Sequence, residues 1–141
     1  MVQSCGFQNY CEATVNSTGS AAEISADGSL DVLDNNLNLL ATNVPPNRFG
    51  YFLMSQTQGF IPLFGSSQGN FCLGSPFIRF AGDGMLSTAG GELTLSPDFG
   101  TLPSGAMFVA GSEWNFQTWF RDVNPTNTSN TTNGLTVQFC P

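Results

Sequence analysis

The sequence predicts an all-β domain, an antiparallel β-sandwich or jelly roll of about ten short strands. Gly, Pro, Asn, Ser and Thr interrupt the chain every few residues, and no stretch keeps an apolar period of 3.6 residues for three turns. Short segments with β patterning alternate with turn-forming clusters instead. The 141 residues are expected to form one domain, 1–141.

Ten segments show this strand pattern. Turn-forming clusters such as ADGS, VPPN, SSQG and AGDG separate many of them, because Asn, Asp, Gly and Pro favour turn conformations. The expected strands are 21–26, 37–42, 48–56, 59–64, 70–73, 77–81, 84–88, 91–96, 113–121 and 134–139.

Alternation of apolar and polar residues predicts which strand faces are buried. In 134–139, Leu135, Val137 and Phe139 share one face, which is typical of a half-buried strand. Segment 48–56 has apolar side chains on both faces and is therefore expected to be covered on both sides.

Segment 113–122, EWNFQTWFRD, holds both tryptophans of the chain. As a strand it sends one set of side chains towards the core: Trp114, Phe116, Thr118 and Phe120. The other face combines one aromatic ring with three hydrogen-bonding side chains: Asn115, Gln117, Trp119 and Arg121. Such a face suits a neutral sugar, whose C–H groups stack on the indole while its hydroxyls bond the polar groups. Alternatively, the face is structural: Trp119 covers the sheet, while Arg121 stacks on it and pairs with a nearby carboxylate.

Segment 124–134, NPTNTSNTTNG, is polar and rich in turn formers, so it is expected to be a surface loop. Asn127 and Asn130 begin Asn-x-Ser/Thr sequences, as does Asn16. These matter only in a host that glycosylates, and chance occurrence in a solvated loop is the favoured explanation.

Composition excludes several classes of function. The chain has three Arg, no Lys and no His against ten Asp and Glu, a net charge of −7. Nucleic-acid binding is disfavoured, because clusters of Lys and Arg neutralise phosphates. Anionic membranes are disfavoured for the same reason. The sequence contains no run of 18 apolar residues, so no membrane-spanning helix is predicted.

Four cysteines, Cys5, Cys11, Cys72 and Cys140, form an even set. Their spacing does not match a zinc site, so two disulfides and an oxidising, extracellular compartment are predicted. Four cysteines allow three pairings. Joining Cys5 to Cys140 and Cys11 to Cys72 would hold both termini.

Catalysis is not expected. Without His or Lys, the remaining option is a pair of carboxylates such as glycosidases use. Glu92, Glu113 and Asp122 lie on or beside expected strands, but no spacing singles out two of them.

Calcium is the one metal that the sequence suggests. Asp27, Asp31 and Asp34 lie close together, and calcium prefers six to eight oxygen ligands, several of them carboxylates. The segment lacks EF-hand spacing, and Asp and Asn are also common turn formers. No other cofactor is predicted.

Four blocks of the chain resemble a module found at the C-terminal end of secreted proteins of planctomycetes and myxobacteria. These blocks are YCEATVNSTGSAAEISADGS (10–29), LNLLATNVPPNRFGYFLMS (37–55), FGSSQGNFCLGSPFIRF (64–80) and NFQTWFRDVNP to the end (115–141). The resemblance implies an extracellular all-β accessory domain, and it brings no assigned activity.

The resemblance also bears on individual residues. Cys11 and Cys72 match the two most typical cysteines of the module, which favours their pairing. Four residues match its closing motif: Gln117, Trp119, Arg121 and Asp122. Phe120 stands where the module usually has Tyr, and Cys5 stands alone where the module often has a cysteine-rich prefix.

Two functions from different classes remain. The favoured one is a non-catalytic extracellular module that binds neutral polysaccharide or mediates adhesion. It would use Trp119 with its neighbours, or exposed Tyr10, Tyr51 and Phe60. The alternative is a structural module of a cell surface or appendage that self-associates through sheet edges or apolar patches.

Overall fold

A computed structural model describes residues 5–141 and shows twelve β-strands in antiparallel pairs. The strands are β1 Gly6–Tyr10, β2 Glu23–Gly28, β3 Leu37–Thr42, β4 Phe49–Ser55, β5 Gln58–Ile61, β6 Phe71–Leu73, β7 Phe77–Arg79, β8 Met85–Leu86, β9 Leu93–Leu95, β10 Glu113–Val123, β11 Asn127–Thr131 and β12 Gly134–Gln138. Four short 3-10 turns connect some of them: η1 Val32–Asp34, η2 Phe64–Ser66, η3 Ala81–Asp83 and η4 Pro103–Gly105. Within residues 5–141 no helix is long and apolar enough to cross a membrane.

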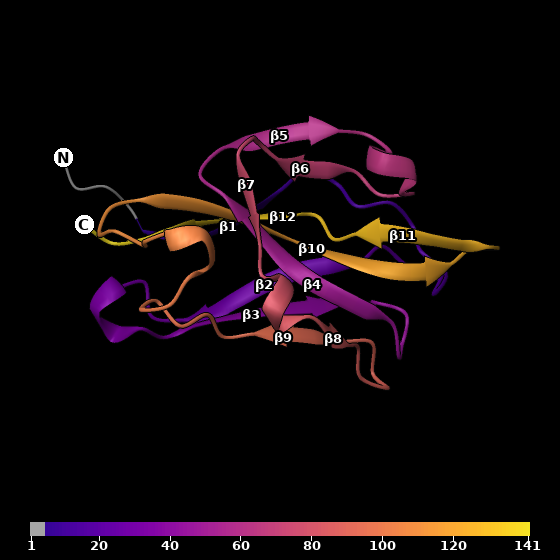
Figure 1. The fold of residues 1–141 in the computed structure, drawn as a ribbon, viewed down its shortest axis with the longest axis horizontal. Helices are drawn as coiled ribbons and strands as arrows, with labels where there is room; N and C mark the ends of the chain where they lie inside the picture. Colours follow the sequence, from indigo (N-terminus) through magenta and orange to yellow (C-terminus); the bar gives the residue numbers. More distant parts are fainter. Residues whose placement is uncertain (1–4) are drawn as a thin grey trace.

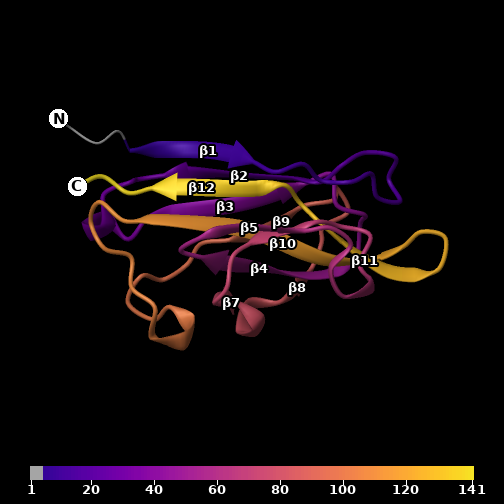
Figure 2. The ribbon, with the colours of Figure 1, turned by 90° about the horizontal axis from the view of Figure 1, so that it is seen from above.

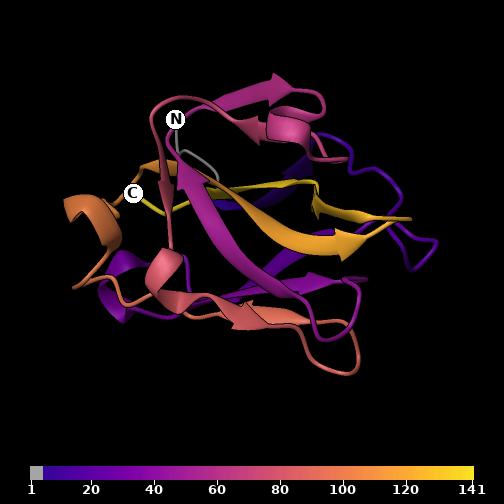
Figure 3. The same ribbon diagram turned by 45° about the vertical axis from the view of Figure 1, so that its right-hand side comes forward.

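The strands form three layers (Figures 1 and 3). The middle layer is a seven-stranded sheet in the order β1-β12-β10-β4-β7, to which β11 adds beside β10 and β8 beside β4. The three-stranded sheet β2-β3-β9 covers one face of it, and the β5–β6 hairpin lies over the other. The predicted all-β sandwich is confirmed. The expected strands 59–64 and 70–73 correspond to β5 and β6, but the sequence pattern did not indicate that they form a separate hairpin outside the two larger sheets.

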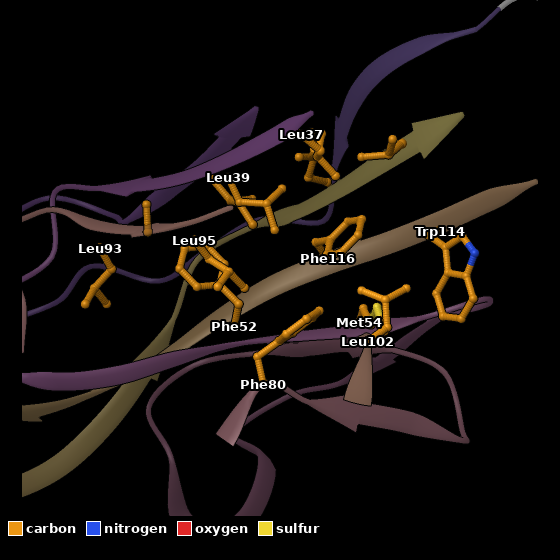
Figure 4. Packing of buried hydrophobic residues seen from close by; sticks show 14 of the residues in the cluster. Leu37, Leu39, Phe52, Met54, Phe80, Leu93, Leu95, Leu102, Trp114 and Phe116 are labelled. Atoms are coloured by element: carbon orange, nitrogen blue, oxygen red, sulfur yellow. The ribbon is translucent and has the colours of Figure 1, made fainter. Parts of the chain in front are cut away.

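The main core lies between the two larger sheets (Figure 4). Phe52 and Met54 of β4 and Phe116 of β10 point into it from the seven-stranded sheet, and Leu39 and Leu93 meet them from the opposite sheet. The expected inner face of β10 is confirmed, since its even-numbered side chains from 114 to 120 are all buried. Truncating any of the large core side chains to Ala should cost about 2–5 kcal/mol of folding free energy.

Strand β10 is the centre of the middle sheet (Figure 2). One edge of β10 pairs first with β12 and then with β11, while the other edge pairs with β4. Trp119 therefore has Thr131 of β11 on one side and Tyr51 of β4 on the other. Because paired residues point to the same face, these three side chains form a row across the outer surface.

Segment 124–134 is not a loop throughout, contrary to the prediction. Residues 127–131 form β11, which pairs with β10 from Val123 back to Trp119. Asn130 is buried and accepts hydrogen bonds from Thr14 Oγ1 at 3.1 Å and the Thr131 amide at 2.7 Å. Polarity did not prevent burial here, because the protein itself supplies partners for these polar groups.

Strand β1 was also missed. It forms an edge of the middle sheet by pairing with β12, and most of its residues are exposed. An edge strand needs no apolar face when it buries little, so Gly6–Tyr10 shows no alternation.

Two disulfides are formed, Cys5–Cys140 and Cys11–Cys72, with Cα–Cα distances of 4.8 and 6.4 Å. The first joins the two ends of the described chain, and the second ties the segment after β1 to β6. The chain-entropy model gives about 4–5 kcal/mol of stabilisation for each, from loops of 135 and 61 residues. Two structural disulfides indicate an oxidising, extracellular-type environment.

Candidate functional site

The outer face of β10 is divided by the β5–β6 hairpin, which covers only part of it. Asn115 and Gln117 lie beneath the hairpin and are fully buried. Trp119 is half-buried because it packs against the side of the hairpin, and Arg121, further along the strand, is exposed. The four residues predicted to share one binding face do share it, but the structure leaves only two of them accessible.

The Gln117 side chain joins three backbone segments. Its Oε1 accepts a hydrogen bond from the Cys72 amide at 2.9 Å, and its Nε2 donates to the carbonyls of Asn70 at 2.7 Å and Thr132 at 2.8 Å. Gln117 thus holds β6 over β10 and fixes the chain just after β11. Its amide has no exposed group to offer a ligand.

Asn115 is similarly occupied. Its Oδ1 accepts a hydrogen bond from Thr136 Oγ1 at 2.6 Å, and its Nδ2 donates to the Ser55 carbonyl at 3.3 Å. The prediction that Asn115 and Gln117 contact a sugar therefore does not fit their positions, because both amides satisfy buried groups of the protein.

An open groove lies between the outer face of the middle sheet and the chain reversal of the hairpin. It has a volume of about 230 Å³. Its floor is formed by Tyr51 and Leu53 of β4 with Trp119 of β10, and aromatic rings from η2, β6 and β7 stand beside them. The lining residues are Tyr51, Leu53, Phe64, Gly65, Ser67, Gly69, Phe71, Phe77, Arg79, Trp119, Ser129 and Thr131.

The aromatic rings of the groove hold one another in place. Tyr51 meets Trp119 edge to face, with ring centroids 5.1 Å apart. Phe71 stacks on Phe64 and meets Phe77 edge to face, both at 4.8 Å. Each such pair contributes about 0.5–1.5 kcal/mol beyond its buried area, so the rings form a preorganised surface.

Hydroxyl groups lie along the groove as well. Half-buried Ser129 comes from β11, as does Thr131, and Ser67 comes from the segment that follows η2. Ser67 and Thr131 are buried, and their hydroxyls bond the Gly69 amide and the Asn70 carbonyl. This segment lies against β11, since the Gln68 amide donates to the Ser129 carbonyl at 2.9 Å. Gly69 permits the approach, because a Cβ there would lie 2.5 Å from Thr131 Oγ1. The chain reversal between β5 and β6 thereby forms a wall of the groove.

Two of the three arginines of the chain lie at this groove. Arg79 lines it from β7, opposite Leu53 of β4. Arg121 lies at its rim, with Cζ 5.4 Å from the centre of the Trp119 ring. The stacking of Arg121 on Trp119, predicted as part of the structural alternative to a binding face, is therefore present. No Asp or Glu is among the residues that line the groove.

The calcium site predicted at Asp27, Asp31 and Asp34 is not formed. Asp31 accepts a hydrogen bond from the Leu33 amide at 3.0 Å and begins η1, while Asp34 accepts one from Ser29 Oγ at 2.5 Å. Asp27 accepts from Asn38 Nδ2 on the neighbouring strand. These carboxylates stabilise turns, and residues 5–141 contain no cluster of three or more His, Cys, Asp or Glu able to hold a metal ion.

The carboxylates considered for hydrolysis do not pair along β10. Glu113 and Asp122 stand nine residues apart on this strand, which corresponds to about 30 Å at an extended rise. Asp122 is buried and accepts hydrogen bonds from the Ser17 amide at 2.9 Å and Ser17 Oγ at 2.5 Å. Asp122 thus fixes the segment that precedes β2.

Of the other aromatics considered for binding, Tyr51 lies in the groove and the remaining two do not. Tyr10 donates from its hydroxyl to the Cys72 carbonyl at 2.7 Å, and burial, with a smaller effect of the Glu113 carboxylate, raises the pKa of the phenol well above its ordinary range. Phe60 is exposed on β5. Sequence reasoning missed Phe64, Phe71, Phe77 and Arg79, for which an excess of aromatics in 60–80 was the only local signal.

The fold and the groove define a class: a disulfide-bonded, all-β domain with an open aromatic groove on one sheet face. Comparison with protein-family models, with curated proteins and with solved structures finds no match to this chain. The resemblance to the planctomycete and myxobacterial module stays a prediction.

Proposed function

We propose that this domain is a non-catalytic, secreted accessory module that binds polysaccharide in the groove beside Trp119. The observation that carries the proposal is the groove itself: half-buried Tyr51 and Trp119 on its floor, fixed by their mutual packing, with hydroxyls and a guanidinium around them. Sugar rings suit such a site, because their C–H faces pack on aromatic rings while their hydroxyls need nearby polar partners.

The composition of the groove modifies the prediction made from the sequence. The predicted fit to a neutral glycan used the amides of Asn115 and Gln117 together with Trp119 and Arg121, and the two amides are buried. Half-buried Ser129 takes their place as a hydrogen-bonding group, whereas Ser67 and Thr131 are buried and bond the Gly69 amide and the Asn70 carbonyl. Secretion is supported by the two disulfides. The proposed binding site therefore retains Trp119 and Arg121, and the proposed ligands include both neutral and charged polysaccharides.

Ser129→Trp tests the proposal without removing any aromatic residue. Ser129 lines the groove from the edge strand β11, so an indole there would fill the space above Trp119. Asn127→Trp is the matched control, because Asn127 lies on the same strand and points to the same face but outside the groove. Removal of Trp119 itself would be harder to interpret, since Trp119 packs against the buried cluster of Leu53, Phe71 and Leu73.

The oxidised protein and both variants would be screened against cellulose, chitin, xylan, mannan, pectin and alginate. We expect retention on at least one polysaccharide, reduced at least tenfold by Ser129→Trp and unchanged by Asn127→Trp. Failure of the parent protein to bind any of them, or equal binding by both variants, would contradict the proposal. Melting temperatures of the two variants provide the control for folding.

The second candidate, a self-associating structural module, is favoured by a different surface. Among residues 5–141, β5 pairs only with β6, which leaves its other edge free. Large apolar side chains are exposed beside that edge, with exposed fractions of 61% for Phe60, 47% for Ile61 and 63% for Leu63. Free edges with apolar side chains are common sites of strand pairing between chains. Sedimentation velocity over a range of concentrations tests this candidate.

A further inference from the structure

The charge distribution around the groove is opposite to that of the whole chain. The chain carries ten acidic residues against three arginines, a net charge of −7. The groove nevertheless has Arg79 in its lining and Arg121 at its rim, with no carboxylate among its lining residues. Both arginine side chains are in exposed positions, where a ligand can reach them.

We propose that the glycan bound in this groove is acidic, a polysaccharide whose sugar rings carry carboxylate or sulfate groups. This inference rests on the proposed function. A guanidinium presents a fork of N–H donors that fits carboxylate and sulfate oxygens in a bidentate manner. Neutral sugars need only hydroxyl partners such as half-buried Ser129, and they do not require a guanidinium group.

The two arginines stand on opposite sides of the groove floor. Arg79 of β7 pairs with Leu53 of β4, which in turn pairs with Gln117 of β10. Arg121 lies four residues after Gln117 on β10. Strand spacing and rise place their Cα atoms about 15 Å apart, with Tyr51 between the two strands that carry them. A ligand that spans the floor and meets both guanidinium groups is therefore an oligosaccharide with more than one charged ring.

Packing also directs Arg121. Its guanidinium lies over the Trp119 ring at 5.4 Å, an arrangement that holds the flexible side chain at the rim. Ser129 is its neighbour on β11. A sugar seated on Tyr51 would thus have its anionic group within reach of a guanidinium that is already oriented.

The test compares glycans that differ only in charge. Oligogalacturonate is paired with its methyl-esterified form, and dextran sulfate is paired with dextran, which separates a carboxylate ligand from a sulfate ligand. Dissociation constants are measured in EDTA, so that calcium cannot bridge the acidic protein to the polyanion. We expect the charged member of at least one pair to bind at least tenfold more tightly than the neutral member, and to bind less tightly as salt is raised.

Arg79→Gln and Arg121→Gln should each weaken binding of the charged glycan about tenfold or more, the effect of losing one charge-assisted hydrogen bond. Arg48→Gln is the matched control, since it makes the same change of charge outside the groove and should leave binding unchanged. Melting temperatures confirm that each variant folds.

Two results would overturn the inference and leave the proposed function standing. One is equal binding of neutral and charged glycans with no effect of Arg79→Gln or Arg121→Gln. The other is binding of the charged glycan that all three arginine variants weaken equally, which would reflect net charge alone. If neither these glycans nor the polysaccharides used to test the proposed function bind at all, the proposed function fails together with the inference.

Discussion

Replacement of Gln117 by Met separates a structural amide from a ligand-binding one. Met has nearly the same length and volume as Gln but lacks both polar groups. The change removes the partner of the Cys72 amide and of the Thr132 carbonyl. It also removes one of the two hydrogen bonds to the Asn70 carbonyl, which keeps the bond from Thr131 Oγ1 at 2.9 Å. Cys72 and Thr132 are buried, so water cannot easily replace the lost bonds.

The expected loss of stability follows from these three bonds. Each contributes about 1 kcal/mol net, and a buried group left unpaired adds a desolvation penalty, so the free energy of unfolding should fall by about 3–5 kcal/mol. For a domain of 141 residues this corresponds to a melting temperature lower by roughly 10–15 °C. Urea denaturation would measure the change in free energy of unfolding directly, provided that the slope of this free energy against urea concentration is the same in the variant and the parent protein.

Gln8→Met is the matched control, because it makes the same substitution at an exposed position of β1 and should change stability by less than about 0.5 kcal/mol. Below its melting temperature, Gln117→Met should retain glycan binding within a few fold. A variant that unfolds like the parent protein but no longer binds glycan would refute the reasoning and return Gln117 to the binding site.

Two further predictions concern the hairpin layer. The double change Cys11→Ser with Cys72→Ser should lower the free energy of unfolding by about 4 kcal/mol, because the unfolded chain regains the entropy that closing a loop of 61 residues removes. Calorimetry without reductant would measure this loss. An unchanged melting temperature would show that the bridge does not stabilise the fold. Phe60→Ser should abolish any concentration-dependent increase in the sedimentation coefficient, because Phe60 is exposed beside the free edge of β5. Self-association that persists in this variant would exclude that edge as the contact between molecules.

Local patterns were sufficient for the class of fold and for much of the core. The strict alternation in 113–121 correctly predicted that Trp114, Phe116 and Phe120 face the interior, because a strand sends successive side chains to opposite faces. The even number of cysteines predicted two disulfides, and both are present. These inferences need only neighbours in the chain or a count of residues.

Strand β11 shows where local patterns were insufficient. Asn127–Thr131 carries no apolar residue, so nothing in its own composition indicates a strand. Its structure comes from pairing with β10 and from hydrogen bonds such as that between Asn130 and Thr14, which lie 116 residues apart.

The candidate site depended on the tertiary structure in the same way. Asn115, Gln117, Trp119 and Arg121 alternate identically along the sequence, and the sequence therefore determined that they share a face of one strand. Only the tertiary structure decided that the first two are buried and the last two are accessible, because the β5–β6 hairpin, held by Gln117 and the Cys11–Cys72 bridge, covers just part of that strand. The position of such a cover is set by contacts between residues far apart in the chain, and the period of a single strand carries no information about them.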